Sequence, residues 1–288
     1  MSDSVDDWWL RLVDRIGSAG RCVVAFSGGV DSSVVAAAAF RSDADAVAVT
    51  ADSPSVARWQ LTMARRVAAA IGIEHRVIRT DELTREAYVV NHRDRCFHCK
   101  STLYESLELI RSNVDGVLFS GTNADDLGDI RPGIRAGQMA GVQTPLADLG
   151  FTKSSVRRLA RHVGLPNADL PASPCLASRL RYGLPVTAAR LAKVEAAEAI
   201  VRARGFSDCR VRLLADDHAS IEVPAAEVVR VDGELLQKLR GLGFATIDVA
   251  SDGLRSGRLN TLTPLTGPPS GGRESTTDRD DQASSVSS

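Results

Sequence analysis

The sequence lacks the long apolar segments that a membrane requires. No apolar run in its 288 residues approaches the roughly 20 that are needed to span a bilayer. The first residues, MSDSVDDWWLRLVDRIG, are acidic and amphipathic, whereas a secretory signal begins with a basic stretch and continues with an apolar one. We therefore expect a cytoplasmic protein without a membrane partner.

An excess of charge is also missing. Lys and Arg number 35 against 36 Asp and Glu, so the net charge is −1, and no Lys/Arg-rich run occurs. Proteins that bind nucleic acid, tRNA-modifying enzymes included, are expected to present a basic surface. With 44% hydrophobic and 25% charged residues the composition is that of a globular protein, so nucleic acid is not an expected partner.

Cysteines are few and odd in number, which disfavours a disulfide framework. Of the five, Cys96 and Cys99 form the CxxC pair of RCFHCK, but the second CxxC that a four-ligand zinc site would need is absent. The pair could be half of a zinc site, a redox pair or part of an iron–sulfur site. Cys22 and Cys209 lie in predicted strands and are expected to be buried packing residues.

Cys175 has a different setting, in PASPCLASR, with Arg179 and Arg181 following it. Guanidinium groups lower the pKa of a nearby thiol and raise its thiolate fraction, which favours a sulfur nucleophile or donor. The alternative is a structural free cysteine in a loop.

The stretch VVAFSGGVDSSVV predicts a strand, a glycine turn and a helix. Backbone N–H groups around Gly28 and Gly29, together with the start of the helix, can close around a phosphate. The lysine of the Walker A pattern is absent, so a P-loop kinase or NTPase is not expected.

Strands and helices alternate over residues 21–165, which predicts an α/β fold with a doubly wound parallel sheet. The expected strands are 21–26, 45–50, 74–78 and 116–120, and the expected helices are 31–40, 55–71 and about 100–112. TADSP and SGTNADD follow strands, as the glycine turn does, so three polar loops should meet at one edge of the sheet. The carboxylates of Asp125, Asp126 and Asp129 in the last of these loops suit Mg²⁺, although a solvated acidic loop is the alternative.

The remainder of the chain predicts a helix capped by Thr152 and ended by Gly164, a proline-rich linker, and a small α+β domain of order αββαβ. Arg210 and Arg212 alternate along one predicted strand, which suits a phosphate ligand, although an exposed basic strand face is the alternative. The expected division is 1–165, 166–185 (the linker), 186–263 (the α+β domain) and 264–288, a low-complexity tail expected to be disordered.

Taken together, these segments resemble the PP-loop ATP pyrophosphatases, and among them the LarE family of ATP-dependent sulfur transferases. The resemblance spans about residues 21–260 and lies in SGGVDSS, TADSP, RCFHCK, GTNADDLGDIRPG, TPLADLGFTKSSVRRLA, PASPCLASR, RVR and GLRSGRLN. LarE proteins make pyridinium-3,5-bisthiocarboxylic acid mononucleotide, a precursor of the nickel-pincer cofactor of lactate racemase. The resemblance implies a pyridinium mononucleotide substrate, ATP and Mg²⁺ as cofactors, and a homo-oligomer.

The resemblance also assigns roles to residues of this sequence. ATP and its pyrophosphate would be bound by Ser27, Gly28, Gly29, Val30, Asp31, Ser32, Asp52, Ser53, Gly121, Asn123 and Arg131. The substrate would be bound by Arg179, Glu198, Arg210, Arg212, Arg255 and Ser256. Cys175 and Asp31 would be catalytic, and Lys100 would meet a phosphate or the adenylated carboxylate unless it is a solvated lysine at a helix start.

Two sources of sulfur occur in the family. In some members the cysteine of PCLASR gives up its own sulfur and becomes dehydroalanine, whereas in others three cysteines hold a [4Fe–4S] cluster that carries an extra sulfide. Cys96, Cys99 and Cys175 occupy all three positions here, which favours the cluster form and a partner that supplies sulfide.

The sequence departs from the family pattern at Ala168, Leu170, Leu184 and Pro185, and in LLADDHASIEV. These positions bear on the substrate and not on ATP activation. The alternatives are another adenylating PP-loop enzyme, such as a tRNA thiolase or an amide-forming synthetase, and a non-catalytic nucleotide-binding module.

Overall fold

The computed structural model describes residues 4–128, 132–255 and 258–259. The chain divides into a compact unit, Met1–Ser256, and a second unit, Gly257–Ser288, of which only two residues are described. The predicted tail at 264–288 and the predicted boundaries near 165, 185 and 263 therefore stay predictions. No helix in the described ranges is long and apolar enough to cross a membrane.

The first sheet is parallel and has the strand order β3-β2-β1-β4. Its strands are β1 (Arg21–Ala25), β2 (Asp45–Asp52), β3 (Glu74–Arg79) and β4 (Val117–Phe119). The strand order changes direction between β1 and β4, and in such sheets the loops at that point form the binding crevice. The α/β prediction with a doubly wound parallel sheet is confirmed.

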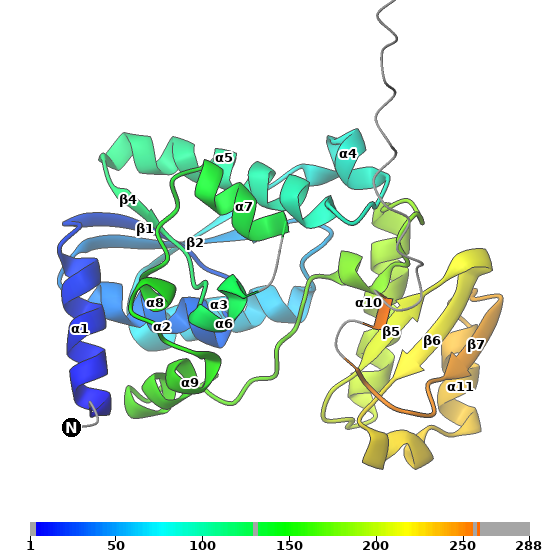
Figure 1. The fold of residues 1–288 in the computed structure, drawn as a ribbon. Coiled ribbons are helices and arrows are strands. Elements are labelled where there is room, and N and C mark those ends of the chain that lie inside the picture. Colours follow the sequence, from blue (N-terminus) through cyan, green and yellow to red (C-terminus); the bar gives the residue numbers. More distant parts are fainter. Residues whose placement is uncertain (1–3, 129–131, 256–257, 260–288) are drawn as a thin grey trace, which may run out of the picture. The chain divides into compact units, whose positions relative to one another are not determined.

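Helices cover both faces of this sheet (Figure 1). On one face, Cys22 and Val24 of β1 pack among residues of α1 (Val5–Gly17), α2 (Val30–Arg41), α3 (Arg58–Ile71) and α9 (Lys153–His162). On the other face, Val23 packs with Tyr104 of α5 (Arg95–Val114) and Ala136 of α7 (Pro132–Met139). Successive residues of β1 therefore point to opposite cores, as a strand buried on both sides requires.

Short elements connect this framework. They are η1 (Glu82–Thr84), α4 (Glu86–Val89), α6 (Ala124–Leu127), α8 (Pro145–Asp148) and η2 (Leu176–Arg179). Thr152 caps α9 by accepting a hydrogen bond from the Ser155 N–H at 3.3 Å, and Gly164 adopts a φ of +72° just beyond the helix. Both ends of this helix were predicted from the sequence.

The second sheet has the order β5-β6-β7, with β5 (Arg210–Leu213) antiparallel to β6 (His218–Glu222) and β6 parallel to β7 (Thr246–Val249). Val211 and Leu213 pack with apolar residues of α10 (Ala188–Ala203) and α11 (Gly233–Arg240). Two short turns, η3 (Ala215–Asp217) and η4 (Ala225–Arg230), complete this part. Because side chains alternate along a strand, Arg210 and Arg212 share the opposite face of β5.

Candidate active site

The glycine turn after β1 is fixed by close packing. Gly28 has a φ of +72°, and a Cβ there would lie 2.6 Å from the Cα of Ala64 in α3. A side chain is therefore excluded both by backbone conformation and by space. Helix α2 follows at once, with Gly29 as an N-cap that makes no side-chain cap hydrogen bond. The first N–H groups of α2 thus lack the side-chain acceptor that usually caps a helix, which suits an anion.

Serine hydroxyls hold the turn together from within. Ser27 Oγ accepts a hydrogen bond from the Gly29 N–H at 3.2 Å, and Ser32 Oγ donates to the Gly29 carbonyl at 3.1 Å. Asn167, far along the chain, donates from Nδ2 to the Gly28 carbonyl at 2.8 Å and to Ser33 Oγ at 2.9 Å. The loop is therefore preorganised by residues of the turn and by one residue of the linker.

The loop after β4 reaches the same place. A Cβ on Gly121 would lie 2.5 Å from the backbone nitrogen of Ser32, so only glycine allows this approach. Asn123 Nδ2 donates to Asp31 at 3.3 Å, and the ammonium group of Lys153 forms an ion pair with the other oxygen of Asp31. Asp31, Gly121 and Asn123, predicted from separate motifs, are thus brought together.

The acidic residues that follow have structural partners. Asp126 accepts a hydrogen bond from the Asn123 N–H at 3.2 Å, and Asp125 accepts one from the Lys153 N–H at 2.8 Å. Asp129 and Arg131 lie outside the described residues. Among the described residues, no three His, Cys, Asp or Glu side chains are grouped so that they could hold a metal ion. The magnesium site stays a prediction.

A cleft of about 250 Å³ opens beside the glycine turn. One wall is formed by the turn and by Lys153, a second by Trp59, Gln60 and Met63 of α3, and a third by the linker residues 170–174. Pro174 at the end of this wall is the residue before Cys175. The glycine turn and the segment that leads to Cys175 therefore border the same cleft.

The segment TADSP was expected to follow a strand that ends at residue 50, but Asp52 is the last residue of β2 and only Ser53 follows it. Both side chains have protein partners. Asp52 pairs with Arg58 at 2.6 Å, and Ser53 Oγ donates to buried Glu82 at 2.6 Å. Neither residue lines the cleft described above, so their contact with adenosine stays a prediction.

The three predicted sulfur ligands are within electrostatic reach of one another. Burial first, and then the charge of Cys175, raises the pKa of the Cys99 thiol to about 12. Desolvation and the same Cys175 charge raise the pKa of Cys96. Burial lowers the pKa of Arg95, but the negative charges of Cys175, Cys96, Tyr88 and Tyr182 together have a larger effect, so the pKa is raised. Among the described residues, however, Cys96, Cys99 and Cys175 do not form a group that could hold a metal ion, so the iron–sulfur site stays a prediction.

The other two cysteines are buried in strands or beside them, as expected for packing residues. Cys22 and Cys209 are both fully inaccessible to solvent, and burial raises the pKa of Cys22 to about 11 and that of Cys209 to about 12. A protonated thiol among apolar neighbours is a poor nucleophile.

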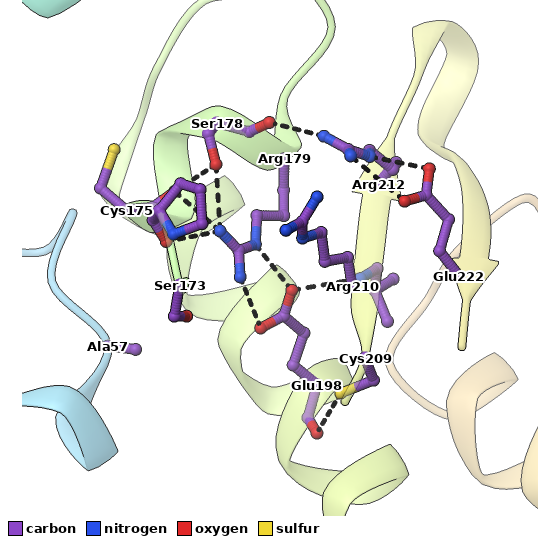
Figure 2. A network of polar contacts seen from close by, with 12 residues as sticks. Ala57, Ser173, Cys175, Ser178, Arg179, Glu198, Cys209, Arg210, Arg212 and Glu222 are labelled. Atoms are coloured by element: carbon purple, nitrogen blue, oxygen red, sulfur yellow. Dashed lines mark hydrogen bonds and ion pairs between the residues drawn. The ribbon is translucent and has the colours of Figure 1, made fainter. Parts of the chain in front are cut away.

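Arg179 anchors the backbone next to Cys175 (Figure 2). Its guanidinium donates to Glu198 at 2.8 Å, to the carbonyl of Pro174 at 2.5 Å and to the carbonyl of Cys175 at 3.2 Å. Both Arg179 and Glu198 are buried, and Arg202 makes a second ion pair with Glu198 at 2.7 Å. The Cys175 sulfur points away from this network, whereas the carbonyl points into it.

Within the part of the chain that the structure describes, no carboxylate forms an ion pair with Arg210. In the β5–β6 register it stands opposite Glu222, but Glu222 pairs diagonally with Arg212, at 2.9 Å and 3.1 Å. Among the described residues, the guanidinium of Arg210 makes one long hydrogen bond, 3.3 Å to the carbonyl of Arg255. Burial, followed by the charges of Arg179 and Arg212, lowers its pKa. Figure 2 shows its guanidinium beside that of Arg179.

The remaining predicted residues are placed as follows. Arg255 is exposed and pairs with Asp252 at 3.2 Å. Lys100 is exposed on α5, with its ammonium 5.8 Å from the centre of the Tyr104 ring. Ser256 lies outside the described residues.

Sequence reasoning missed several residues of this site. They are Gln60, Arg95, Lys153, Asn167, Arg202 and Glu222. Lys153 and Asn167 stand within or just before segments that were singled out, but their partners lie more than 100 residues away. The strand pattern of ASIEV contains a signal for Glu222, because it places this carboxylate with Ser220 on the polar face of the strand, the face that the arginines of the paired strand share.

The sequence of this chain is similar to those of several known proteins. Residues 13–133 match the asparagine synthase family model. An uncharacterized protein of Synechocystis is 38% identical over 88% of this chain and 96% of its own length. The pyridinium-3,5-bisthiocarboxylic acid mononucleotide synthase of Lactiplantibacillus plantarum is 32% identical over 88% of this chain and 94% of its own length. The chain belongs to the LarE family. It is thereby a member of an ATP-using PP-loop family, as its motifs predicted.

Proposed function

We propose that this protein is an ATP-dependent sulfur transferase that acts on a pyridinium dicarboxylate mononucleotide in nickel-pincer cofactor biosynthesis. It would adenylate a carboxylate of the substrate and replace an oxygen of that carboxylate with sulfur. The proposal is supported by the named LarE relative, by the cleft at the glycine turn and by Pro174, the residue before Cys175, in one wall of that cleft.

The setting of the Arg210 guanidinium is the main structural support for a phosphate-bearing substrate. A guanidinium that is 6% exposed and has no carboxylate partner among the described residues is costly, because a buried charge needs a counter-charge. The phosphate of a mononucleotide would supply that charge, and a guanidinium can bind it through two parallel hydrogen bonds. Glu222 and Glu198 pair with Arg212 and Arg179 and so hold the neighbouring cations in place.

The ATP half of the reaction would use the glycine turn. A carboxylate oxygen of the substrate attacks the α-phosphorus, the bond to the β-phosphate oxygen breaks, and pyrophosphate leaves. The N–H groups at the start of α2 and the ammonium of Lys153 would bind the departing pyrophosphate. Mg²⁺, which screens phosphate charge during such a transfer, would be held by Asp31 together with the phosphates.

The sulfur half would use Cys175 or a sulfide held beside it. In the sacrificial route the Cys175 thiolate displaces AMP to form a thioester, and elimination across its Cα–Cβ bond releases the thiocarboxylate and leaves dehydroalanine. In the cluster route Cys96, Cys99 and Cys175 would bind a [4Fe–4S] cluster, which supplies a nucleophilic sulfide when it is bound. We favour the cluster route because cysteines stand at all three positions that the family resemblance implies, Cys96, Cys99 and Cys175.

Intact-protein mass spectrometry separates the two routes. Anaerobically purified protein is incubated with ATP, Mg²⁺ and the dicarboxylated pyridinium mononucleotide, with and without added sulfide. Thiolated product with unchanged protein mass and a requirement for sulfide supports the cluster route, and Cys96→Ala should then lose iron and multiple turnover. Loss of one H₂S at Cys175 instead identifies the sacrificial route. Absence of thiolated product under both conditions contradicts the proposed function.

A variant of Arg210 tests the substrate site. Arg210→Gln should raise the KM for the mononucleotide by about tenfold or more, the effect of losing a charge-assisted hydrogen bond, and leave ATP binding unchanged. Arg204→Gln is the matched control, because Arg204 pairs with Asp232 and Glu234 at partly exposed positions. An unchanged KM in Arg210→Gln would remove Arg210 from the substrate site.

A further inference from the structure

The backbone around Cys175 is held from three sides. Arg179 binds the carbonyls of Pro174 and Cys175, and the Leu176 N–H donates to the Ser55 carbonyl at 2.8 Å. The third contact comes from α3, where Gln60 Nε2 donates to the carbonyl of Ser173 at 2.7 Å. These contacts fix the main chain on both sides of Cys175, and none of them uses its thiol.

Gln60 is itself held at both ends of its amide. Its Oε1 accepts a hydrogen bond from the Ala57 N–H at 3.3 Å, at the start of α3, while Nε2 binds Ser173. Because one oxygen and one nitrogen are used, neither rotation of the amide nor a shorter side chain could keep both contacts. Gln60 also lines the cleft beside the glycine turn. One side chain therefore joins the wall of the nucleotide cleft to the segment that carries the sulfur.

We infer that Gln60 is a positioning residue that keeps Cys175 within reach of the adenylated carboxylate. The inference rests on the proposed function and adds a residue to it. The two steps act on one carboxylate of the substrate. Adenylation modifies its oxygen beside the glycine turn, and sulfur transfer then takes place at its carbon. A displacement of the segment 173–175 would leave adenylation intact but slow the capture of the adenylate, since productive attack requires close alignment. Water would then hydrolyse the adenylate to carboxylate and AMP.

The test measures thiolated product formed per pyrophosphate released. Gln60→Met keeps the length of the side chain but removes both hydrogen bonds, and Gln60→Glu keeps the acceptor for the Ala57 N–H but removes the donor to Ser173. In both variants product per pyrophosphate should fall about tenfold or more. Because Gln60 lines the cleft, the rate of pyrophosphate release is measured alongside, and the ratio corrects for any change in it. Gln138→Met, at an exposed position on α7, is the matched control and should leave the ratio unchanged.

Hydrogen exchange gives a second readout that needs no turnover. In both Gln60 variants the amides of Ser173 and of residues 175–178 should exchange several-fold faster, while those of α2 keep their protection. An unchanged product ratio together with unchanged exchange in this segment overturns the inference. If the unsubstituted protein releases pyrophosphate but makes no thiolated product, the proposed function fails, and the exchange result still decides whether Gln60 anchors the segment.

Discussion

The ammonium group of Lys153 lies against the carboxylate of Asp31, although the two residues are 122 positions apart in the sequence. Asp31 stands in the first turn of α2, and Lys153 begins α9. The pair places one carboxylate and one ammonium group beside the glycine turn. In the proposed function Asp31 would bind the positive metal ion and Lys153 the negative phosphates. Binding of ATP would therefore compete with this ion pair for both partners.

Replacing Asp31 with Ala should abolish pyrophosphate release, because the variant loses the carboxylate proposed to hold Mg²⁺ and leaves Lys153 without its partner. The measurement is pyrophosphate released from ATP in the presence of the pyridinium substrate. Asp169→Ala is the control, because Asp169 forms an exposed ion pair with Arg161 and is not itself among the residues that line the cleft. Pyrophosphate release near the unsubstituted rate would show that Asp31 is not needed for ATP cleavage.

Replacing Gly121 with Ala should weaken both folding and ATP binding. The new methyl group would lie 2.5 Å from the Ser32 nitrogen, so the loop or α2 must move. We expect a loss of about 1–3 kcal/mol in the free energy of unfolding, measured with urea, and weaker ATP binding by calorimetry. Gly233→Ala, where an added Cβ meets nothing within 4 Å, should leave ATP binding unchanged. Equal ATP affinity in both variants would contradict the close approach.

Removing the carboxylate of Glu198 should destabilise the protein strongly. Glu198 and Arg179 are 0% and 2% exposed, so Glu198→Ala leaves a buried guanidinium without its partner. The expected loss is about 3–5 kcal/mol in the free energy of unfolding. Glu234→Ala removes exposed ion pairs with Arg204 and Lys238 and should cost less than about 1 kcal/mol. A comparable loss in the two variants would mean that the buried pair adds nothing beyond a surface pair.

The Cys99 thiol should resist alkylation at neutral pH. Burial raises its pKa to about 12, above the ordinary 9.0, so at neutral pH the thiol is almost entirely protonated in the cluster-free protein. Iodoacetamide labelling, followed by peptide mass spectrometry, should speed up with pH well beyond 9. The same pKa difference affects stability. Between pH 9 and 12 the thiol ionises in the unfolded chain but not in the folded one, so the free energy of unfolding falls as pH rises. A labelling rate that levels off near pH 9 would contradict burial of the thiol.

The sequence predicted the sheet because the alternation of strands and helices is a local signal. Strands β1, β2, β3 and β4 lie within one or two residues of their expected ranges. The helix expected from about residue 100 begins instead at Arg95, since RCFHC is part of α5 and not of the loop before it. The short helices α4, α6 and α8 carry too few turns to produce a helical period, so no pattern could predict them.

The site was predicted in its motifs but not in its pairings. The glycine turn, the Asn123 loop and the three cysteines can be read as segments, because each has its own composition. The contacts of Asn167 with Gly28 and of Arg212 with Glu222 depend on the tertiary arrangement and on strand register, which no local pattern contains. Homo-oligomer formation, the iron–sulfur cluster and the sulfide partner stay predictions.

Asn167 binds the carbonyl of Gly28, and the chain then runs along the cleft to Cys175. Arg157 holds the same stretch by donating to the carbonyls of Ala168 and Leu170, both at 3.0 Å. The stretch from Asn167 to Cys175 is thus held at both ends, at the glycine turn by Asn167 and at Cys175 by Arg179. An insertion or deletion within this stretch would therefore change the spacing between the glycine turn and Cys175, because both ends are fixed by hydrogen bonds to backbone carbonyls.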